Sequence, residues 1–155
     1  MSQDTTEKES KFNEEDLRDH ETSAGIIITD SGYCILDHVK HDMLTFPIGK
    51  VHSDQNPYDG LKMEMFEELD IRVQKAKELF NYKRVYDFDG HKVNVNTHVF
   101  IIQKYTGKIR NKEPKKHRNV LFMSLTDINR TVRKIADCVM EYIKWYKRNG
   151  GLNEE

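Results

Sequence analysis

The stretch from residue 46 to residue 71 reads FPIGKVHSDQNPYDGLKMEMFEELDI and decides the fold of this chain. A Phe-Pro-Ile-Gly turn leads into a predicted helix whose end carries Glu64, Glu67 and Glu68. At about 100° per residue, these three carboxylates share one arc of the helix surface. Like charges four residues apart destabilise a helix by about 0.2–0.5 kcal/mol per pair. Such a face suits a hard divalent cation, which takes oxygen ligands and offsets the repulsion, and we expect it to face solvent.

The predicted helix, Pro57–Leu69, has recognisable ends. Asn56 is an N-cap candidate, and Pro57 follows at the first helical position, where its missing N–H costs nothing. Gly60 lies one turn before Glu64 and allows another backbone to approach closely. Asp70 stands where helices end in a left-handed residue, a conformation that Asx residues tolerate.

This stretch resembles the Nudix box, G-x5-E-x7-R-E-U-x-E-E-x-G-U, where U is an aliphatic residue. Gly49 takes the leading glycine, and Glu64, Glu67 and Glu68 take the three helix glutamates. The match spans 23 of 155 residues, and its flanks, AGIIIT and EPKKHRNVLFMSLTDI, are also similar to the family. Three positions depart from the pattern, with Gln55 in place of Glu, Met63 in place of Arg and Asp70 in place of Gly.

The resemblance implies an α/β (α+β) fold, a Nudix-type α/β/α sandwich with a mixed sheet between flanking helices. It implies a metal-dependent hydrolase that cleaves a diphosphate linkage in a nucleoside diphosphate derivative, with Mg²⁺ or Mn²⁺ as cofactor. Candidate substrates are nucleoside triphosphates, dinucleoside polyphosphates, ADP-ribose, dinucleotide cofactors and capped RNA 5′ ends. Phosphoryl transfer asks the protein for positioning and charge neutralisation, which metals supply.

The resemblance also implies the site residues. Glu64, Glu67 and Glu68 are the candidate catalytic residues and metal ligands, with the Gly49 carbonyl as a further oxygen ligand. By analogy Glu64 orients or deprotonates the water, although the base varies within the family. Family members often add a metal-binding carboxylate from the loop before the last strand, and Glu113 is the only acidic residue between 107 and 127. A solvated loop charge is the equal alternative for Glu113.

Met63 and Gln55 support a second hypothesis, a catalytically weak Nudix-fold module that binds a nucleotide or RNA. The family's arginine orients a catalytic glutamate, and a thioether cannot do so. The three retained glutamates favour the enzyme, because a protein without hydrolase activity has no need to keep mutually repelling charges.

Several residues are candidates for substrate binding. Lys50 and His52 follow the glycine turn, and Tyr86 and Phe88 lie on a predicted strand where a nucleobase could stack. Strand aromatics are more often core residues, and an isolated loop histidine more often has no role. Residues 104–118 carry seven Lys/Arg, which either meet phosphates or RNA or are simply solvated.

Composition limits the remaining possibilities. A net charge of −1 favours no class of partner, and the seven histidines form no zinc motif. Cys34 and Cys138 are too few for a disulfide framework, which fits a reducing cytosol. No apolar run is long enough to span a bilayer and no secretory signal is present, so we expect a cytoplasmic protein without a membrane partner. Whether the chain is a monomer or a homodimer stays open.

The chain divides into a predicted disordered acidic arm, residues 1–20, with seven Asp/Glu against three Lys/Arg, and a single domain, residues 21–152. Asp89-Gly90 predicts a hairpin turn between two long strands. Ser124 or Thr126 is expected to cap one last helix, whose core-facing stripe runs from Val132 to Tyr146 and which ends near Gly150. The expected strands are 24–29, 33–39, 77–87, 92–104 and 119–123.

Overall fold

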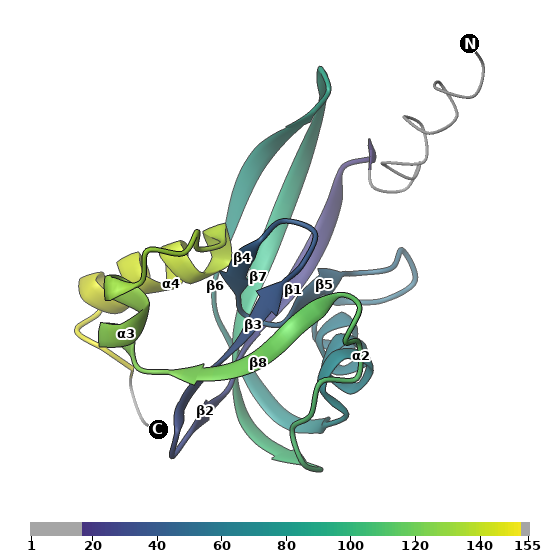
Figure 1. Ribbon diagram of the computed structural model, residues 1–155. Helices are drawn as coiled ribbons and strands as arrows, with labels where there is room; N and C mark the ends of the chain where they lie inside the picture. The colour runs from purple at the N-terminus through teal and green to yellow at the C-terminus, as the bar shows by residue number, and fades with distance from the viewer. Residues whose placement is uncertain (1–16, 153–155) are drawn as a thin grey trace.

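The computed structural model describes residues 17–152, and Figure 1 shows the arrangement of their elements. The expected arm at residues 1–20 falls mostly outside this range, although Asp19 accepts a hydrogen bond from the backbone of Asn94. The described elements are β1 (His20–Ile26), β2 (Ile28–Thr29), β3 (Gly32–His38), β4 (Met43–Thr45), β5 (Ile48–Lys50), α2 (Pro57–Leu69), β6 (Arg72–Phe88), β7 (His91–Thr106), β8 (His117–Met123), α3 (Leu125–Arg130) and α4 (Asp137–Arg148).

The strands form a mixed sheet and a second, antiparallel sheet. In the first sheet the order is β5-β1-β7-β6, with β1 parallel to β7 and the other pairs antiparallel. In the second sheet β3 pairs with β2, β4 and β8. In Figure 1 the strands lie between α2 on one side and α4 on the other. The expected sandwich with a mixed sheet and flanking helices is confirmed.

Two apolar cores lie on either side of the strands. One core joins α4 to the mixed sheet through residues such as Ala24, Ile26 and Tyr142, and the other joins α2 to it through Leu61 and Phe100. Alternate residues of β3 enter the two cores, as the two-residue period of a strand requires. This packing fixes α2 firmly, so its functional side chains have a rigid support.

The expected strands are present with shifted ends. The segment 24–29 is divided into β1 and β2, and β1 begins earlier, at His20. The hairpin at Asp89-Gly90 is confirmed, with φ values of 54° and 90° that suit a two-residue turn between twisted strands. Both of its strands extend beyond the predicted limits, to Arg72 and Thr106.

The expectation of one last helix is wrong. Ser124 caps a short helix, α3, with Asp127 completing a capping box, and the chain then leaves helical geometry until Asp137. The intervening segment pairs with β4, because Leu44 N donates to Lys134 O and Ala136 N donates to Leu44 O. Val132, predicted to face the core, is 100% exposed. Backbone pairing with a distant strand therefore overrides the helical periodicity.

The helix of the opening stretch has the predicted limits. The Asn56 side chain accepts from Asp59 N at 2.8 Å, and Pro57 occupies the first turn. Asp70 ends the helix in the left-handed conformation, with φ 62°. None of the helices within residues 17–152 has the length and apolar character needed to cross a membrane.

Candidate active site

The glutamates of α2 differ in their surroundings. Glu68 is 1% exposed and Glu64 is 9% exposed, whereas Glu67 is an exposed neighbour that raises the pKa of Glu64. The expectation that all three face solvent is therefore wrong for two of them. The loop before β8 and the turn at Gly49 cover this side of the helix, which the helix sequence alone does not reveal.

Gly49 and Glu64 are in direct contact. A side-chain carbon built onto Gly49 would overlap the carboxyl group of Glu64. Glycine is required here because the carboxyl group occupies the space of a side chain. Gly60 plays a similar but looser part, since an added carbon there would meet Val51 Cγ2 at 3.0 Å.

The loop before β8 is tied to the end of α2 by its backbone. Lys112 N donates to Glu68 O at 3.0 Å, and Arg110 N donates to Leu69 O at 3.1 Å. Glu113 N in turn donates to the Asn111 side chain at 3.1 Å. These bonds bring Glu113 beside Glu68, although 45 positions separate the two residues in the chain. The candidate loop carboxylate thus joins the helix glutamates.

A lysine lies inside this group of acids. Lys116 Nζ is 3.0 Å from Glu68 Oε2 and 3.7 Å from Glu113 Oε1. Burial lowers the pKa of Lys116, but the nearby carboxylates Glu68, Glu113 and Glu64 outweigh it and raise the pKa above the usual value. The lysine is therefore cationic. We call Glu64, Glu68, Glu113 and Lys116 the carboxylate cluster.

His117 adjoins the carboxylate cluster, and the sequence analysis did not single it out. Its side chain is buried, and its Nε2 lies 4.0 Å from Glu68 Oε2. Burial, Lys116 and His38 lower the pKa of His117 to about 4, so the ring is neutral near pH 7. The only available signal was its position at the start of β8, directly after the loop that carries Glu113.

The two helix glutamates of the cluster, Glu64 and Glu68, hold their protons more tightly than usual. Burial raises the pKa of Glu64 to about 8, and the charge of Glu68 adds to this effect. Burial also raises the pKa of Glu68 to about 7, although Lys116 opposes the change. Groups that titrate near neutral pH are common at catalytic sites, where a base must both accept and release a proton.

The donor set of the cluster suits a hard divalent cation. Glu68 Oε1 and Glu113 Oε1 are buried and accept no hydrogen bond from residues 17–152. Buried oxygens of this kind need a partner, and carboxylate oxygens are the ligands that Mg²⁺ prefers. Within the same residues, no three His, Cys, Asp or Glu side chains already form a group that could hold a metal ion. Small side-chain movements would therefore accompany binding.

The two main departures from the Nudix box contact each other. Gln55 Nε2 lies 3.5 Å from Met63 Sδ, and Gln55 Oε1 accepts from His52 N at 3.1 Å. Gln55 thus braces the loop before α2 against the helix. Its side-chain oxygen is engaged by the backbone of that loop.

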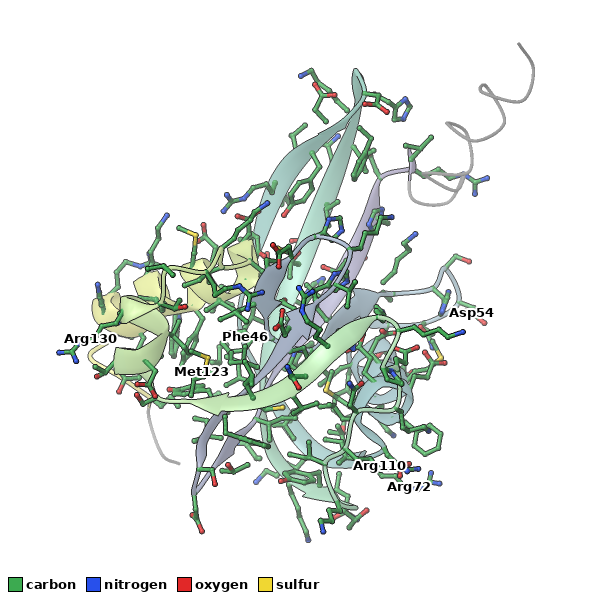
Figure 2. The ribbon with its side chains drawn as sticks, in the orientation of Figure 1. Phe46, Asp54, Arg72, Arg110, Met123 and Arg130 are labelled. Carbon is green, nitrogen blue, oxygen red and sulfur yellow. The ribbon has the colours of Figure 1, made fainter. Side chains whose placement is uncertain are left out.

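Most of the seven cations of residues 104–118 are engaged in ion pairs. Arg110 and Lys112 pair with Asp70, Lys116 pairs with Glu68, and Arg118 pairs with Asp37 and Asp42. In Figure 2 the labelled Arg110, which pairs with Asp70, is seen near the end of α2. Within residues 17–152, Lys104, Lys108 and Lys115 make no ion pair. This pattern weighs against an extended RNA-binding surface.

The four candidate substrate-binding residues line two separate cavities. Lys50 and His52 border one of about 420 Å³ beside the Gly49 turn. Tyr86 and Phe88 border another, of about 460 Å³, between the mixed sheet and the start of α4. Ile48 also lines this second cavity, and the next residue of β5, Gly49, lies against the carboxyl group of Glu64. The second cavity therefore adjoins the carboxylate cluster across β5.

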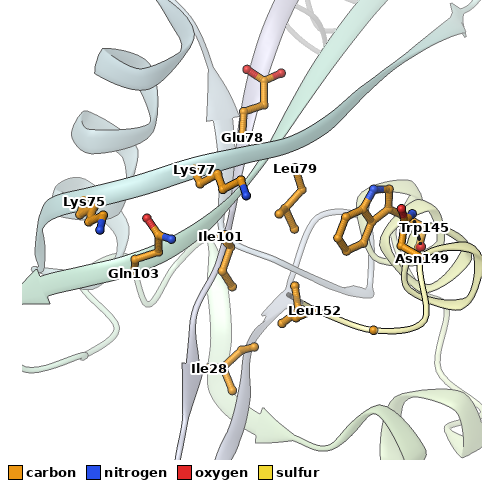
Figure 3. Close-up of a pocket in the computed structure, with 11 residues that line it drawn as sticks. Ile28, Lys75, Lys77, Glu78, Leu79, Ile101, Gln103, Trp145, Asn149 and Leu152 are labelled. Atoms are coloured by element: carbon orange, nitrogen blue, oxygen red, sulfur yellow. Dashed lines mark hydrogen bonds between the residues drawn. The ribbon is translucent and has the colours of Figure 1, made fainter. Parts of the chain in front are cut away.

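A larger cavity, about 870 Å³, lies between β6 and the end of α4 (Figure 3). Lys75, Lys77 and Trp145 line it, and its carboxylate, Glu78, is bonded to His98. It contains no residue of α2 or of the loop before β8. This larger hollow is therefore separate from the carboxylate cluster.

Comparisons with known proteins agree with this fold. A family model described as NUDIX domain matches residues 19–145. A MutT NUDIX hydrolase from Burkholderia pseudomallei has a TM-score of 0.70 at 17% identity, covering 81% of this chain and 95% of that chain. The E. coli ORF135 protein gives 0.68 at 18% identity, covering 88% of this chain and 94% of that chain.

A more distant solved structure is a bifunctional NMN adenylyltransferase/ADP ribose pyrophosphatase from Francisella tularensis, with a TM-score of 0.62 and 14% identity. The match covers 86% of this chain and 42% of that chain. At these identities the structural likeness concerns the fold alone. None of the curated protein sequences compared with this chain matches it.

Proposed function

The chain belongs to the NUDIX domain family, and we propose that it hydrolyses a diphosphate linkage in a nucleoside diphosphate derivative, with Mg²⁺ or Mn²⁺ as cofactor. The observation that carries this proposal is the carboxylate cluster, in which buried oxygens of Glu68 and Glu113 have no hydrogen-bond partner within residues 17–152. Keeping buried acids without a full set of partners is costly for stability, which points to a functional reason for them.

Glu64, Glu67, Glu68 and Glu113 would hold the metal, with the Gly49 carbonyl as a further ligand. The bound cation would neutralise charge on the diphosphate and make a water molecule more acidic. Glu64 is the candidate for orienting that water and accepting its proton, because a pKa raised to about 8 allows proton transfer near neutral pH. Its contact with Gly49 fixes the direction of its carboxyl group.

The nucleoside would occupy the cavity lined by Tyr82, Tyr86 and Phe88. These rings offer an apolar wall for a flat base, while Thr45 and Thr97 add hydroxyl groups. Because Ile48 borders this cavity and the next residue, Gly49, contacts Glu64, a bound nucleoside can extend its phosphates across β5 toward the carboxylate cluster. Lys50 and His52 line the neighbouring cavity and would meet the far end of a longer substrate.

The contact between Gln55 and Met63 favours the enzyme over the binding module. Gln55 and Met63 replace the glutamate and the arginine of the Nudix box, and their side chains are in contact. A neutral contact thus stands where a glutamate and an arginine would form an ion pair. The buried glutamates on the other side of the helix are not involved. The departures therefore change a brace of the loop and leave the proposed metal ligands in place.

The test is a hydrolysis screen with Mg²⁺ and Mn²⁺ over the substrates named above, from nucleoside triphosphates to capped RNA, with products separated by chromatography. We expect wild-type protein to cleave at least one class and Glu64→Gln to lower kcat by about 100-fold or more, as loss of a positioned base typically does. Binding of a nucleotide without cleavage of any compound would instead favour the module.

A further inference from the structure

We propose that the ammonium group of Lys116 is a built-in cation of the carboxylate cluster, and that a divalent ion reaches Glu68 only by displacing it. This inference rests on the proposed function, because it concerns the same metal ligands. It adds that the protein carries its own competitor for the metal. Lys116 would thereby set how tightly the cation binds and would keep the acids neutralised between binding events.

The position of the ammonium group carries the argument. Lys116 Nζ lies 3.0 Å from Glu68 Oε2 and 3.7 Å from Glu113 Oε1. Glu68 Oε1, the oxygen that the lysine does not bond, has no hydrogen-bond partner within the described residues, and at 3.7 Å the ammonium group is too far from Glu113 Oε1 to satisfy that oxygen either. A divalent ion bridging the two carboxylates would need the space between them, where the ammonium group now lies. Ammonium and metal therefore compete for the same oxygens.

The lysine is able to leave without disturbing the loop. Its side chain is 43% exposed, whereas that of Glu68 is 1% exposed. The loop is held by its backbone, because Lys116 N and His117 N both donate to Glu113 O at 2.9 Å. Movement of the flexible Lys116 side chain into solvent would thus free Glu68 while Glu113 keeps its place.

A built-in cation explains how the metal-free cluster is stable. Burial and neighbouring carboxylates raise the pKa of Glu64 and of Glu68, and Lys116 is the cation that opposes this rise for both helix glutamates. An unpaired buried charge is strongly destabilising, so some cation or a proton must accompany these groups. Lys116 fills this role until a divalent ion with stronger attraction for hard oxygens replaces it.

The test is Mn²⁺ binding by isothermal titration calorimetry at pH 7.5, without substrate, for wild type, Lys116→Met and Lys115→Met. Lys115 is exposed and makes no ion pair within residues 17–152, so it provides the matched control. Because removing a competitor strengthens binding, we expect Lys116→Met to bind Mn²⁺ about tenfold more tightly, with Lys115→Met unchanged. Equal or weaker binding by Lys116→Met would overturn the inference.

The same titration separates this inference from the proposed function. If wild type binds Mn²⁺ but Lys116→Met binds it no better, only the role of Lys116 is wrong. If neither protein binds Mn²⁺, both the proposed metal site and the displacement of Lys116 are rejected.

A measurement on wild-type protein avoids any folding defect of the variant. An amine-reactive acylating reagent is applied with and without Mn²⁺, and the extent of reaction at each lysine is read by mass spectrometry. We expect Mn²⁺ to increase the reaction of Lys116 severalfold relative to Lys115, since displacement frees the amine from Glu68. An unchanged or smaller reaction at Lys116 would contradict displacement.

Discussion

The carboxyl group of Glu64 occupies the space in which any residue larger than glycine at position 49 would place its side chain. This contact explains at the scale of single residues why the glycine and the first helix glutamate keep a fixed spacing. The carboxyl group of Glu64 must be oriented to bind a metal, and its contact with the turn at Gly49 restricts its orientation. The two positions therefore work as one unit.

Gly49→Ala tests this unit. The added methyl group would push the Glu64 carboxyl away, so we expect Mn²⁺ affinity to fall by about 10-fold or more, as for other residues that orient metal ligands. Gly60→Ala is the matched control, because its added carbon would meet Val51 and no acid. Calorimetric titration provides the measurement, and equal affinity of Gly49→Ala and wild type would refute the account of this contact.

The pH dependence of the stability of Glu64→Gln tests whether Glu64 is a buried acid. The pKa of Glu64 is raised to about 8 from 4.5, so the folded state holds the proton more tightly than the unfolded state. Its contribution to stability is thus complete below pH 4.5 and is lost as pH rises through 8.

The metal-free variant should therefore melt higher than wild type at pH 9, by about 3–6 °C for a domain of this size. The difference should shrink toward pH 5, where wild-type Glu64 is also neutral. Scanning calorimetry in EDTA from pH 5 to 9 measures both values. A melting temperature below that of wild type at pH 9 would mean that ionised Glu64 stabilises the fold.

Some features of the site depend on residues that are close in the chain, and others depend on contacts with distant residues. Gly49, the three helix glutamates, the Asn56 cap and the left-handed Asp70 are local, and their spacing predicts them. The burial of Glu68 and its pairing with Lys116 depend on a loop 48 positions away in the chain. Periodicity within a helix carries no information on such a contact, so the sequence alone predicts an exposed face.

Among the elements, α2 and the loop before it are joined by the pair of Gln55 and Met63. We expect Met63→Arg alone to lower the melting temperature, because the new cation meets an amide and not a carboxylate. Adding Gln55→Glu should restore it through an ion pair, with a coupling of about 0.5–1 kcal/mol.

A double-mutant cycle on melting temperature and kcat/KM measures this coupling. Glutamate retains the oxygen that accepts from His52 N, so the loop brace survives in the double variant. Additive effects of the two changes would show that the positions act independently, contrary to their contact in the structure.

Three strands meet at His98, which links β7 to Glu21 of β1 and Glu78 of β6. Burial lowers the pKa of His98, but the two carboxylates outweigh this and raise it above 6.5. The stabilisation is therefore fully present below pH 6.5 and is lost as pH rises through the raised pKa.

His98→Gln should melt about 2 °C below wild type at pH 6, and the gap should close by pH 9. Taking the difference between the two proteins removes the contribution of the other titrating groups. A gap that is constant over this range would show that the ion pairs contribute nothing and that the ring acts only through packing.

In the C-terminal segment the structure differs from the helix that the sequence periodicity predicts. A helical stripe from Val132 to Tyr146 predicts one helix, but Leu44 forms backbone hydrogen bonds with Lys134 and Ala136 and ends that continuity. Arg133 within the same segment pairs with the buried Asp37. Both partners lie about 90 residues earlier in the chain, so the break has no local sequence signal. By contrast, the hairpin at Asp89-Gly90 is determined by its two turn residues and was predictable.

At the scale of the whole molecule, β5 connects two different cavities to the carboxylate cluster, because Ile48 lines one, Lys50 lines the other and Gly49 between them contacts Glu64. β5 separates Glu64 and Glu68 from the cavity lined by Tyr86 and Phe88, and Lys50 and His52 border the next hollow. A substrate with a base at one end and a diphosphate in the middle matches this order. The larger cavity of Figure 3 lies away from these acids, so size alone does not locate the site.

We propose that the carboxylate cluster holds the divalent cation on which hydrolysis depends. The most direct measurement is kcat for the best substrate as a function of free Mg²⁺, for wild type, Glu68→Gln and the exposed turn control Asp30→Asn. The account predicts saturable activation of wild type and Asp30→Asn, complete loss in excess EDTA, and a fall in kcat of about 100-fold or more for Glu68→Gln. Hydrolysis that persists undiminished in EDTA, or in Glu68→Gln, would contradict it.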